Sequence, residues 1–200
     1  MKNSVIFDFG GVLIDWDPRH LYRKLIGDEE TMERFLSTIC TNEWQAKQNV
    51  GRPWSEAVAE LVEQYPEHRF LIEAYWSRWP EMLGGAFDDT VAIVGQLKRR
   101  GVRLYGLTNW SAETFPYARE RFDFVGWFDG IVVSGEIGVA KPSPDIFHRL
   151  FQRFGLEPGN AVFIDDHPPN IEAAQSLGLE SHHFGSPQDL RDYLAAAGLI

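Results

Sequence analysis

The chain has 200 residues, a hydrophobic content of 44% and a formal net charge of −10. That apolar content supports a packed globular core, whereas the acidic balance excludes an extended nucleic-acid surface, which needs clustered Lys and Arg. No apolar run reaches the roughly 18 residues that cross a bilayer, and Cys40, the single cysteine, excludes an internal disulfide.

The first predicted element is a buried strand that ends in a carboxylate. The apolar run Val5-Ile6-Phe7 stops at Asp8, and Gly10 and Gly11 follow within three positions. Open α/β sheets bind ligands at the carboxyl ends of their strands, and glycines let a loop bring its backbone close to a ligand. Because the chain enters this strand without a signal sequence, we expect a cytoplasmic protein.

Residues 16–83 predict helices, because strand-like runs disappear and apolar residues take helical spacing. Asp28 and Ser55 are the expected caps of two helices, and a third is expected over residues 67–79. The segment is rich in aromatic residues that we assign mainly to its own core: Trp16, Trp44, Trp54, Tyr75, Trp76 and Trp79. Its polar candidates for substrate contact are Asp17, His20, Glu43 and Asn49. Gly84-Gly85 is the expected return linker.

From Asp88 onward, helical and strand patterns alternate with short loops. Strands are expected over residues 102–107, 130–134, 161–164 and 181–184, with helices between them. Ser143-Pro144 predicts the start of one helix, as cap and first-turn proline, and Gly155 predicts its end. Such alternation is typical of an α/β fold, a Rossmann-like parallel sheet with helices on both faces.

Polar motifs follow the predicted strands, so they should meet at one edge of the sheet. Thr108-Asn109 offers uncharged hydrogen-bond donors for phosphate oxygens. Lys141 precedes Pro-Ser-Pro, a stiff frame that can aim its ammonium group. Asp165-Asp166 ends an apolar strand, where two adjacent carboxylates repel each other unless a cation lies beside them. Oxygen ligands of this kind favour Mg²⁺.

These four motifs, in this order, resemble those of the haloacid dehalogenase superfamily, most of whose members are phosphatases. The segment after the first motif resembles the helical cap of the subgroup that includes β-phosphoglucomutase. The resemblance implies a Rossmann-like core formed by residues 1–15 and 84–200 and a cap formed by residues 16–83. A cap of this kind closes over a small phosphorylated metabolite and excludes water.

The resemblance also implies a role for each motif. Asp8 would be the nucleophile that forms an aspartyl-phosphate, with Thr108 and Asn109 binding the phosphoryl group. Lys141 would neutralise charge between the nucleophile and the phosphate, and would bind substrate as well. Mg²⁺ would be held by the residues Asp8, Gly10 (through its carbonyl), Asp165 and Asp166, of which Asp166 is the principal ligand, with Asp165 beside it.

One position departs from the family pattern. Gly10 stands where most phosphatases of this family carry a second Asp as general acid and base, help worth roughly 10²–10⁴-fold in rate. Another group could deliver the proton, and the nearby candidates are Asp15, Asp17, His20 and His167. A leaving group of low basicity, such as the anomeric oxygen of a sugar 1-phosphate, would need less help. The same departure resembles the α-D-glucose-1-phosphate phosphatase group, which suggests a sugar phosphate as substrate.

Two alternatives remain open. A 2-haloacid dehalogenase would use Asp8 to attack carbon through an aspartyl ester without a metal, but such enzymes typically lack the full Asp165-Asp166 pair. A non-catalytic phosphate-binding module would explain the missing acid, although Asp8 would then repel the bound anion. We therefore expect a hydrolase of small phosphomonoesters, without nucleic-acid or membrane partners, that is a monomer or a weak homodimer.

Overall fold

The structure is a computed structural model, and it describes residues 2–200. Five parallel strands form the main sheet in the order β5-β4-β1-β6-β7. Their bounds are β1 Ser4–Phe7, β4 Arg103–Thr108, β5 Gly130–Val133, β6 Ala161–Asp165 and β7 Ser181–His183. The apolar first strand occupies the centre of the sheet, and all four of its residues are buried.

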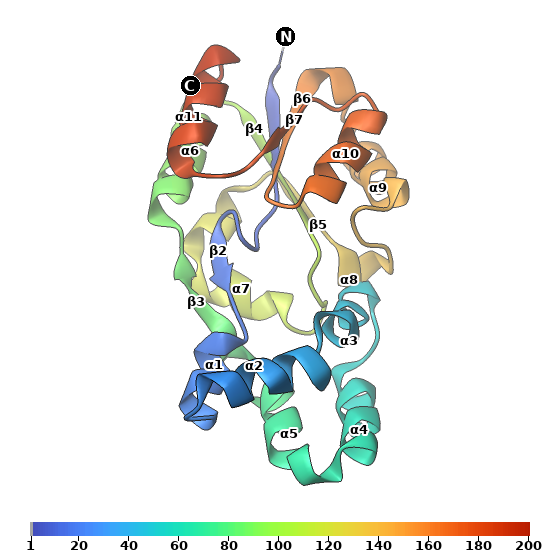
Figure 1. The fold of residues 1–200 in the computed structure, drawn as a ribbon. Coiled ribbons are helices and arrows are strands. Elements are labelled where there is room, and N and C mark those ends of the chain that lie inside the picture. The colour runs from blue at the N-terminus through green and yellow to red at the C-terminus, as the bar shows by residue number, and fades with distance from the viewer. Residues whose placement is uncertain (1) are drawn as a thin grey trace.

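Helices cover both faces of this sheet, which confirms the predicted Rossmann-like α/β fold (Figure 1). Val5 and Phe7 belong to a core shared with α6 (Asp88–Arg99) and α11 (Pro187–Ala196). Ile6, one position away on the opposite face, packs in a second core with α9 (Pro144–Phe154) and α10 (Pro168–Ser176). The remaining elements of this half are α7 Phe115–Arg121, η4 Asp123–Trp127, α8 Ser134–Ile137 and η5 Pro158–Asn160.

A short antiparallel pair, β2 (Ile14–Trp16) and β3 (Leu83–Ala86), brackets residues 17–82, which we call the helical insert. The insert lies at the end of the molecule remote from both termini (Figure 1). Its elements are α1 Arg19–Leu25, α2 Glu29–Thr38, α3 Asn42–Ala46, η1 Gln48–Val50, α4 Trp54–Gln64, η2 Pro66–His68, α5 Arg69–Ser77 and η3 Trp79–Met82. The division into core and cap at residues 15 and 84 remains a prediction.

Local sequence signals set several element boundaries. The Asp28 side chain accepts a hydrogen bond from the Thr31 N–H at the start of α2, as expected. Ser55, in contrast, lies inside α4, which begins one residue earlier, at Trp54. Gly84-Gly85 is not a free linker, because both glycines belong to strand β3. The two glycines are in strand conformation because β3 pairs with β2, a contact that the local sequence does not indicate.

Three further boundaries differ from the sequence-based expectation. The fourth strand runs one residue further than predicted and includes Thr108, while the fifth ends at Val133 because Ser134 begins the short helix α8. The helix between these two strands, which the sequence predicts near residues 112–121, begins at Phe115. Across residues 2–200, no helix combines the length and apolar character that spanning a bilayer requires.

Candidate active site

The central strands β1 and β6 bring Asp8 and Asp165 to the same edge of the sheet. Phe7 pairs with Ile164, so the carboxylates that follow these two residues lie side by side. The Asp8 backbone N–H donates to the Ile164 carbonyl at 2.9 Å, which extends this register to Asp8 itself. Asp165 is fully buried and Asp8 is 9% exposed. The parallel pairing therefore fixes the spacing of two buried acids.

Lys141 lies between these two acids. Its Nζ atom is 2.8 Å from an Asp8 oxygen and 2.6 Å from an Asp165 oxygen, and the side chain is buried. The Asn109 side-chain amide makes two hydrogen bonds to the backbone of Lys141. Its Oδ1 accepts from the backbone N–H at 2.8 Å, and its Nδ2 donates to the backbone carbonyl at 2.9 Å. The ammonium group is thus fixed by its own ion pairs and by a two-point backbone clamp.

Asp165 and Asp166 differ sharply although they are neighbours. Asp165 accepts hydrogen bonds from the Lys141 ammonium, the His167 N–H and, on both of its oxygens, the Asn170 amide. Asp166 is exposed, and its carboxylate lies where a side chain at position 11 would begin, so a residue other than glycine there would displace it. Asp165 is therefore held mainly by protein donors, whereas Asp166 has free lone pairs for a further ligand.

The carboxylate cluster, defined as Asp8, Asp165 and Asp166, concentrates negative charge. Ligand atoms of the three side chains lie within 4.8 Å of one another. Burial raises the pKa of Asp8 to about 7; Lys141 opposes this shift and Asp165 adds to it. Burial and the charge of Asp165 likewise raise the pKa of Asp166. For Lys141, burial acts to lower the pKa, but Asp8 and Asp165 together hold it above its ordinary value.

The charges and donor atoms of the cluster fit a hard divalent cation. Three carboxylates face one ammonium group, so two negative charges stay unbalanced when all four groups are ionised. One divalent cation would neutralise them and would return Asp8 and Asp166 toward their ionised forms. The Gly10 carbonyl, in the loop after Asp8, accepts no hydrogen bond within residues 2–200 and could supply a further oxygen to such a cation.

Thr108 ends β4 beside the cluster. Phe7 pairs with Gly106 across β1 and β4, which places Thr108 just beyond the level of Asp8 at the same sheet edge. Its side chain is 1% exposed. The structure thus brings all of the predicted site residues together at the edge of the sheet that is formed by the carboxyl ends of its strands. Their catalytic, binding and metal-ligating roles remain predictions.

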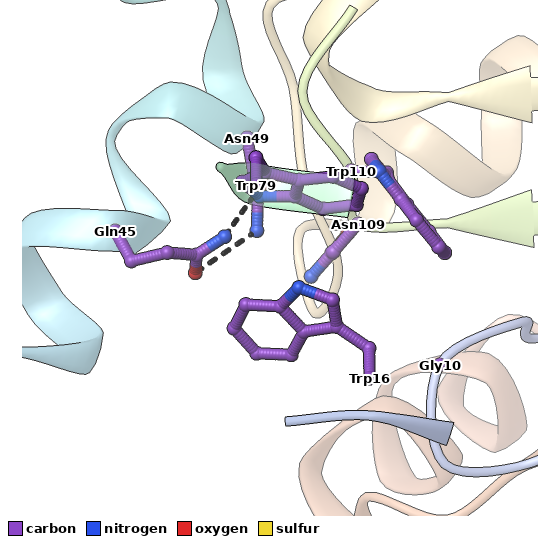
Figure 2. Close-up of a pocket in the computed structure, with 7 residues that line it drawn as sticks. All are labelled: Gly10, Trp16, Gln45, Asn49, Trp79, Asn109 and Trp110. Carbon is purple, nitrogen blue, oxygen red and sulfur yellow. Dashed lines mark hydrogen bonds between the residues drawn. The ribbon is translucent and has the colours of Figure 1, made fainter. Parts of the chain in front are cut away.

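A cavity of about 70 Å³ adjoins this edge of the sheet, and we call it the tryptophan cavity. Figure 2 shows three indole rings around it, with a pair of amides on one side. It is lined by Gly10, Trp16, Gln45, Asn49, Trp79, Asn109 and Trp110. The amides bond reciprocally, with Gln45 Nε2 to Asn49 Oδ1 at 3.2 Å and Asn49 Nδ2 to Gln45 Oε1 at 3.5 Å.

Hydrogen bonds close the helical insert over the cavity. Ser134 Oγ donates to the Asn49 carbonyl at 2.5 Å and accepts from the backbone N–H of Trp110 at 3.0 Å. A Glu113 carboxylate oxygen accepts from the backbone N–H of Trp54 at 2.9 Å. These bonds join the insert to the loop after β4, so the cavity is formed by both halves of the molecule.

Of the four candidate proton donors, His167 follows the carboxylate cluster directly, whereas Asp15, Asp17 and His20 lie in β2 and around the start of α1. His20 Nε2 lies 2.9 Å from Asp15 Oδ2, and Asp17 accepts from the Arg19 N–H at the start of α1. His167 is exposed beside Asp166. None of them lines the tryptophan cavity.

Sequence reasoning also missed several contributors to the site. Of the polar candidates in the insert, Asn49 lines the cavity and Asp17, His20 and Glu43 do not. Trp16 and Trp79 line it as well, whereas Trp44 and Trp54 pack in the core as expected. The clamping roles of Asn109 and Asn170 were missed; the only available signal was their position next to a motif residue.

Comparisons with known proteins agree with this architecture. The family model for haloacid dehalogenase-like hydrolases matches residues 2–178. The sesquiterpene phosphatase astK of Aspergillus oryzae is 28% identical over 90% of this chain and 88% of its own length. Acyl-CoA dehydrogenase family member 10 of Mus musculus is 29% identical over 92% of this chain, which spans only 18% of that protein. Among solved structures, a family enzyme from Bacteroides thetaiotaomicron in a magnesium complex has a TM-score of 0.70 at 23% identity, with 90% of this chain and 92% of that chain covered.

The fold is a parallel α/β sheet that holds buried acids and a lysine at its carboxyl edge, where open sheets of this class bind ligands. Because the family model covers most of the chain, this protein belongs to the haloacid dehalogenase-like hydrolases.

Proposed function

We propose that this hydrolase is a Mg²⁺-dependent phosphatase that cleaves a small phosphomonoester through an aspartyl-phosphate on Asp8. The observation that carries the proposal is the buried ion-pair arrangement, in which one lysine contacts both Asp8 and Asp165 while Asp166 stays available. A negatively charged nucleophile can approach an anionic ester only where cations offset the repulsion. The name of the astK relative, a phosphatase, supports the same reaction.

The ion would be held by Asp8, the Gly10 carbonyl and Asp166, with Asp165 beside them, and would supply positive charge for the phosphoryl oxygens. The Asp8 carboxylate attacks phosphorus, and the bond from phosphorus to the leaving alcohol breaks. Lys141 and the Thr108 hydroxyl stabilise charge on the phosphoryl oxygens. Water then attacks the aspartyl-phosphate, which releases inorganic phosphate and regenerates Asp8.

The missing acid at Gly10 constrains the leaving group. Gly10 has no side chain that could protonate the leaving oxygen, and of the candidate donors His167 lies next to the carboxylate cluster. A leaving group of low basicity, as in a sugar 1-phosphate, would suit this site best, and the sugar phosphate therefore remains part of the proposal.

The test is a panel of phosphomonoesters with and without Mg²⁺, run beside chloride release from 2-chloropropionate. We expect phosphate release that stops on chelation and returns with Mg²⁺, and no chloride release. Chloride release that survives chelation, without phosphate release, would assign the chain to the dehalogenases instead.

A further inference from the structure

We propose that His183 is a positioning residue for the metal site, because its imidazole holds the backbone of Asp166. The inference rests on the proposed function, in which Asp166 is a ligand of Mg²⁺. His183 is the last residue of β7 and belongs to none of the four motifs that the sequence analysis singled out.

The register of the sheet brings His183 to the acid pair. β7 pairs with β6 in parallel, with His183 opposite Asp165. The next residue of the chain, Phe184, donates its backbone N–H to the Asp165 carbonyl at 2.8 Å. His183 Nε2 lies 3.0 Å from the Asp166 carbonyl oxygen. Two consecutive residues at the end of β7 therefore hold the carbonyls of two consecutive acids.

The direction of the imidazole hydrogen bond follows from its partner. A carbonyl oxygen can only accept, so the Nε2 atom of His183 carries the hydrogen and donates it. The bond from Phe184 is made by the backbone and is kept whatever side chain stands there. The bond from His183 is lost when its side chain is removed, so its contribution can be measured.

Asp166 has few other contacts that fix it. Asp165 accepts hydrogen bonds from three other residues. Within residues 2–200, the bond to His183 is the only hydrogen bond between Asp166 and the side chain of another residue. The Asp166 carboxylate lies against Gly11, which has no side chain that could orient it. Without His183 the ion would have to order Asp166 as it binds, which weakens binding.

The neighbouring His182 shows the contrast between packing and positioning. Its ring stacks on Tyr193 with ring centroids 4.5 Å apart, and its Nε2 lies 3.0 Å from Asp189 Oδ2. Both partners belong to α11. Successive side chains of a strand point to opposite faces. His182 therefore anchors a helix, whereas His183 contacts the loop that carries the proposed metal ligand.

Removal of the imidazole should weaken Mg²⁺ binding and leave the fold intact. His183 is exposed, and substitutions at exposed positions usually change stability little. Titration calorimetry with MgCl₂ on substrate-free protein, freed of metal beforehand, measures the affinity for the ion alone. We expect His183→Ala to raise the Kd for Mg²⁺ by roughly three- to tenfold. An unchanged Kd would overturn the proposal.

A conservative variant tests the hydrogen bond itself. His183→Gln keeps an N–H donor on a side chain of similar reach. We expect it to restore most of the Mg²⁺ affinity that His183→Ala loses. If His183→Gln bound Mg²⁺ as weakly as His183→Ala, the donated hydrogen bond would not account for the loss and the proposal would fail.

Two other histidines serve as controls. His148 is exposed on α9, and His148→Ala should change neither the Kd for Mg²⁺ nor the melting temperature. His182→Ala should lower the melting temperature through its lost contacts with α11, with the Kd for Mg²⁺ unchanged. An equal rise in Kd for His182→Ala and His183→Ala would show that β7 merely supports the loop, and would overturn the positioning role.

The dependence of phosphate release on Mg²⁺ provides a second readout. His183→Ala should need roughly three- to tenfold more Mg²⁺ for half-maximal activity, and should reach nearly the kcat of the wild type once Mg²⁺ saturates the site. A loss of kcat that saturating Mg²⁺ does not restore would mean that His183 acts on something other than the binding of the ion, which contradicts the proposal.

The positioning role and the proposed reaction can fail separately. If Mg²⁺ binding depends on His183 but no phosphomonoester of the panel is hydrolysed, the positioning role stands and the phosphatase proposal fails. If phosphate release needs Mg²⁺ equally in the wild type and in His183→Ala, the reaction stands and the positioning role fails. A wild type that binds no Mg²⁺ in the calorimeter would overturn the positioning role.

Discussion

Lys141 and Asp165 are buried polar side chains whose hydrogen-bonding groups find partners inside the protein, whereas the buried indole N–H groups around the tryptophan cavity find none. Pairing in the first region fixes the positions of charges before any ligand arrives, at the cost of burying those charges. The second region has no formal charge to position, and its indole donors are buried without partners. The difference separates a region in which paired charges are fixed for chemistry from a region that is shaped by packing of uncharged side chains.

The largest expected effect comes from removing the nucleophile. Asp8→Asn keeps the shape of the side chain but cannot form an aspartyl-phosphate, so we expect kcat to fall on the order of 10⁴-fold or more. Steady-state phosphate release is the measurement. Asp145→Asn, at an exposed position in the first turn of α9, is the control and should retain full activity. Substantial phosphate release by Asp8→Asn would remove Asp8 from the mechanism.

Removing the lysine should damage both activity and folding. Lys141→Met leaves Asp8 and Asp165 buried without their cation, so we expect a loss of roughly 10²–10³-fold in kcat and of about 3–5 kcal/mol in the free energy of unfolding. Kinetics and urea denaturation measure the two effects.

Lys24→Met is the matched control for this change. Lys24 forms an exposed ion pair with Glu81, and such pairs contribute about 1 kcal/mol or less. If Lys141→Met changed kcat and the free energy of unfolding as little as this control, the buried ion pairs would contribute neither to activity nor to stability.

Asn170→Ala tests whether the hydrogen bonds around Asp165 matter to the site. The Asn170 amide is buried and donates to both Asp165 oxygens, so its loss frees a buried carboxylate to reorient. We expect kcat to fall roughly tenfold, with a rise in the Mg²⁺ concentration for half-maximal activity, since partners of this kind typically contribute 10–100-fold. Asn160→Ala removes a surface amide bonded to Glu157 and should change neither quantity.

Much of the charged region could be predicted from the sequence, because its residues follow apolar strands. Asp8 and Asp165 each end a strand of a parallel sheet, and such strand ends meet at one edge. The proline frame after Lys141 likewise indicated a fixed loop, although not the Asn109 clamp that completes it.

The tryptophan cavity could not be predicted in the same way. Trp16, Trp79 and Trp110 come from β2, η3 and the loop after β4, and helical spacing explains buried aromatics equally well as packing. Only the closure of the insert brings the rings together, through contacts such as the Ser134 bond to the Asn49 carbonyl. Tertiary contacts between distant segments leave no local pattern.

The last expected effect is on stability rather than on activity, and it depends on pH. Burial raises the folded-state pKa of Asp8 to about 7, against 3.8 for an ordinary Asp. Between these pH values the folded state holds a proton that the unfolded state has lost. The free energy of unfolding therefore falls as pH rises, and the proton-linked stability is gone above about pH 7.

The test compares Asp8→Asn with the wild type in the presence of EDTA. At pH 8 the variant should unfold at a higher temperature, because its free energy of unfolding should be greater by up to about 4 kcal/mol. At pH 4 the two proteins should unfold at nearly the same temperature. Thermal unfolding at both pH values measures the difference, and Asp145→Asn should show none. Because Asn cannot carry the negative charge that the buried site disfavours, equal melting temperatures at pH 8 would mean that Lys141 already offsets the burial of Asp8 in full.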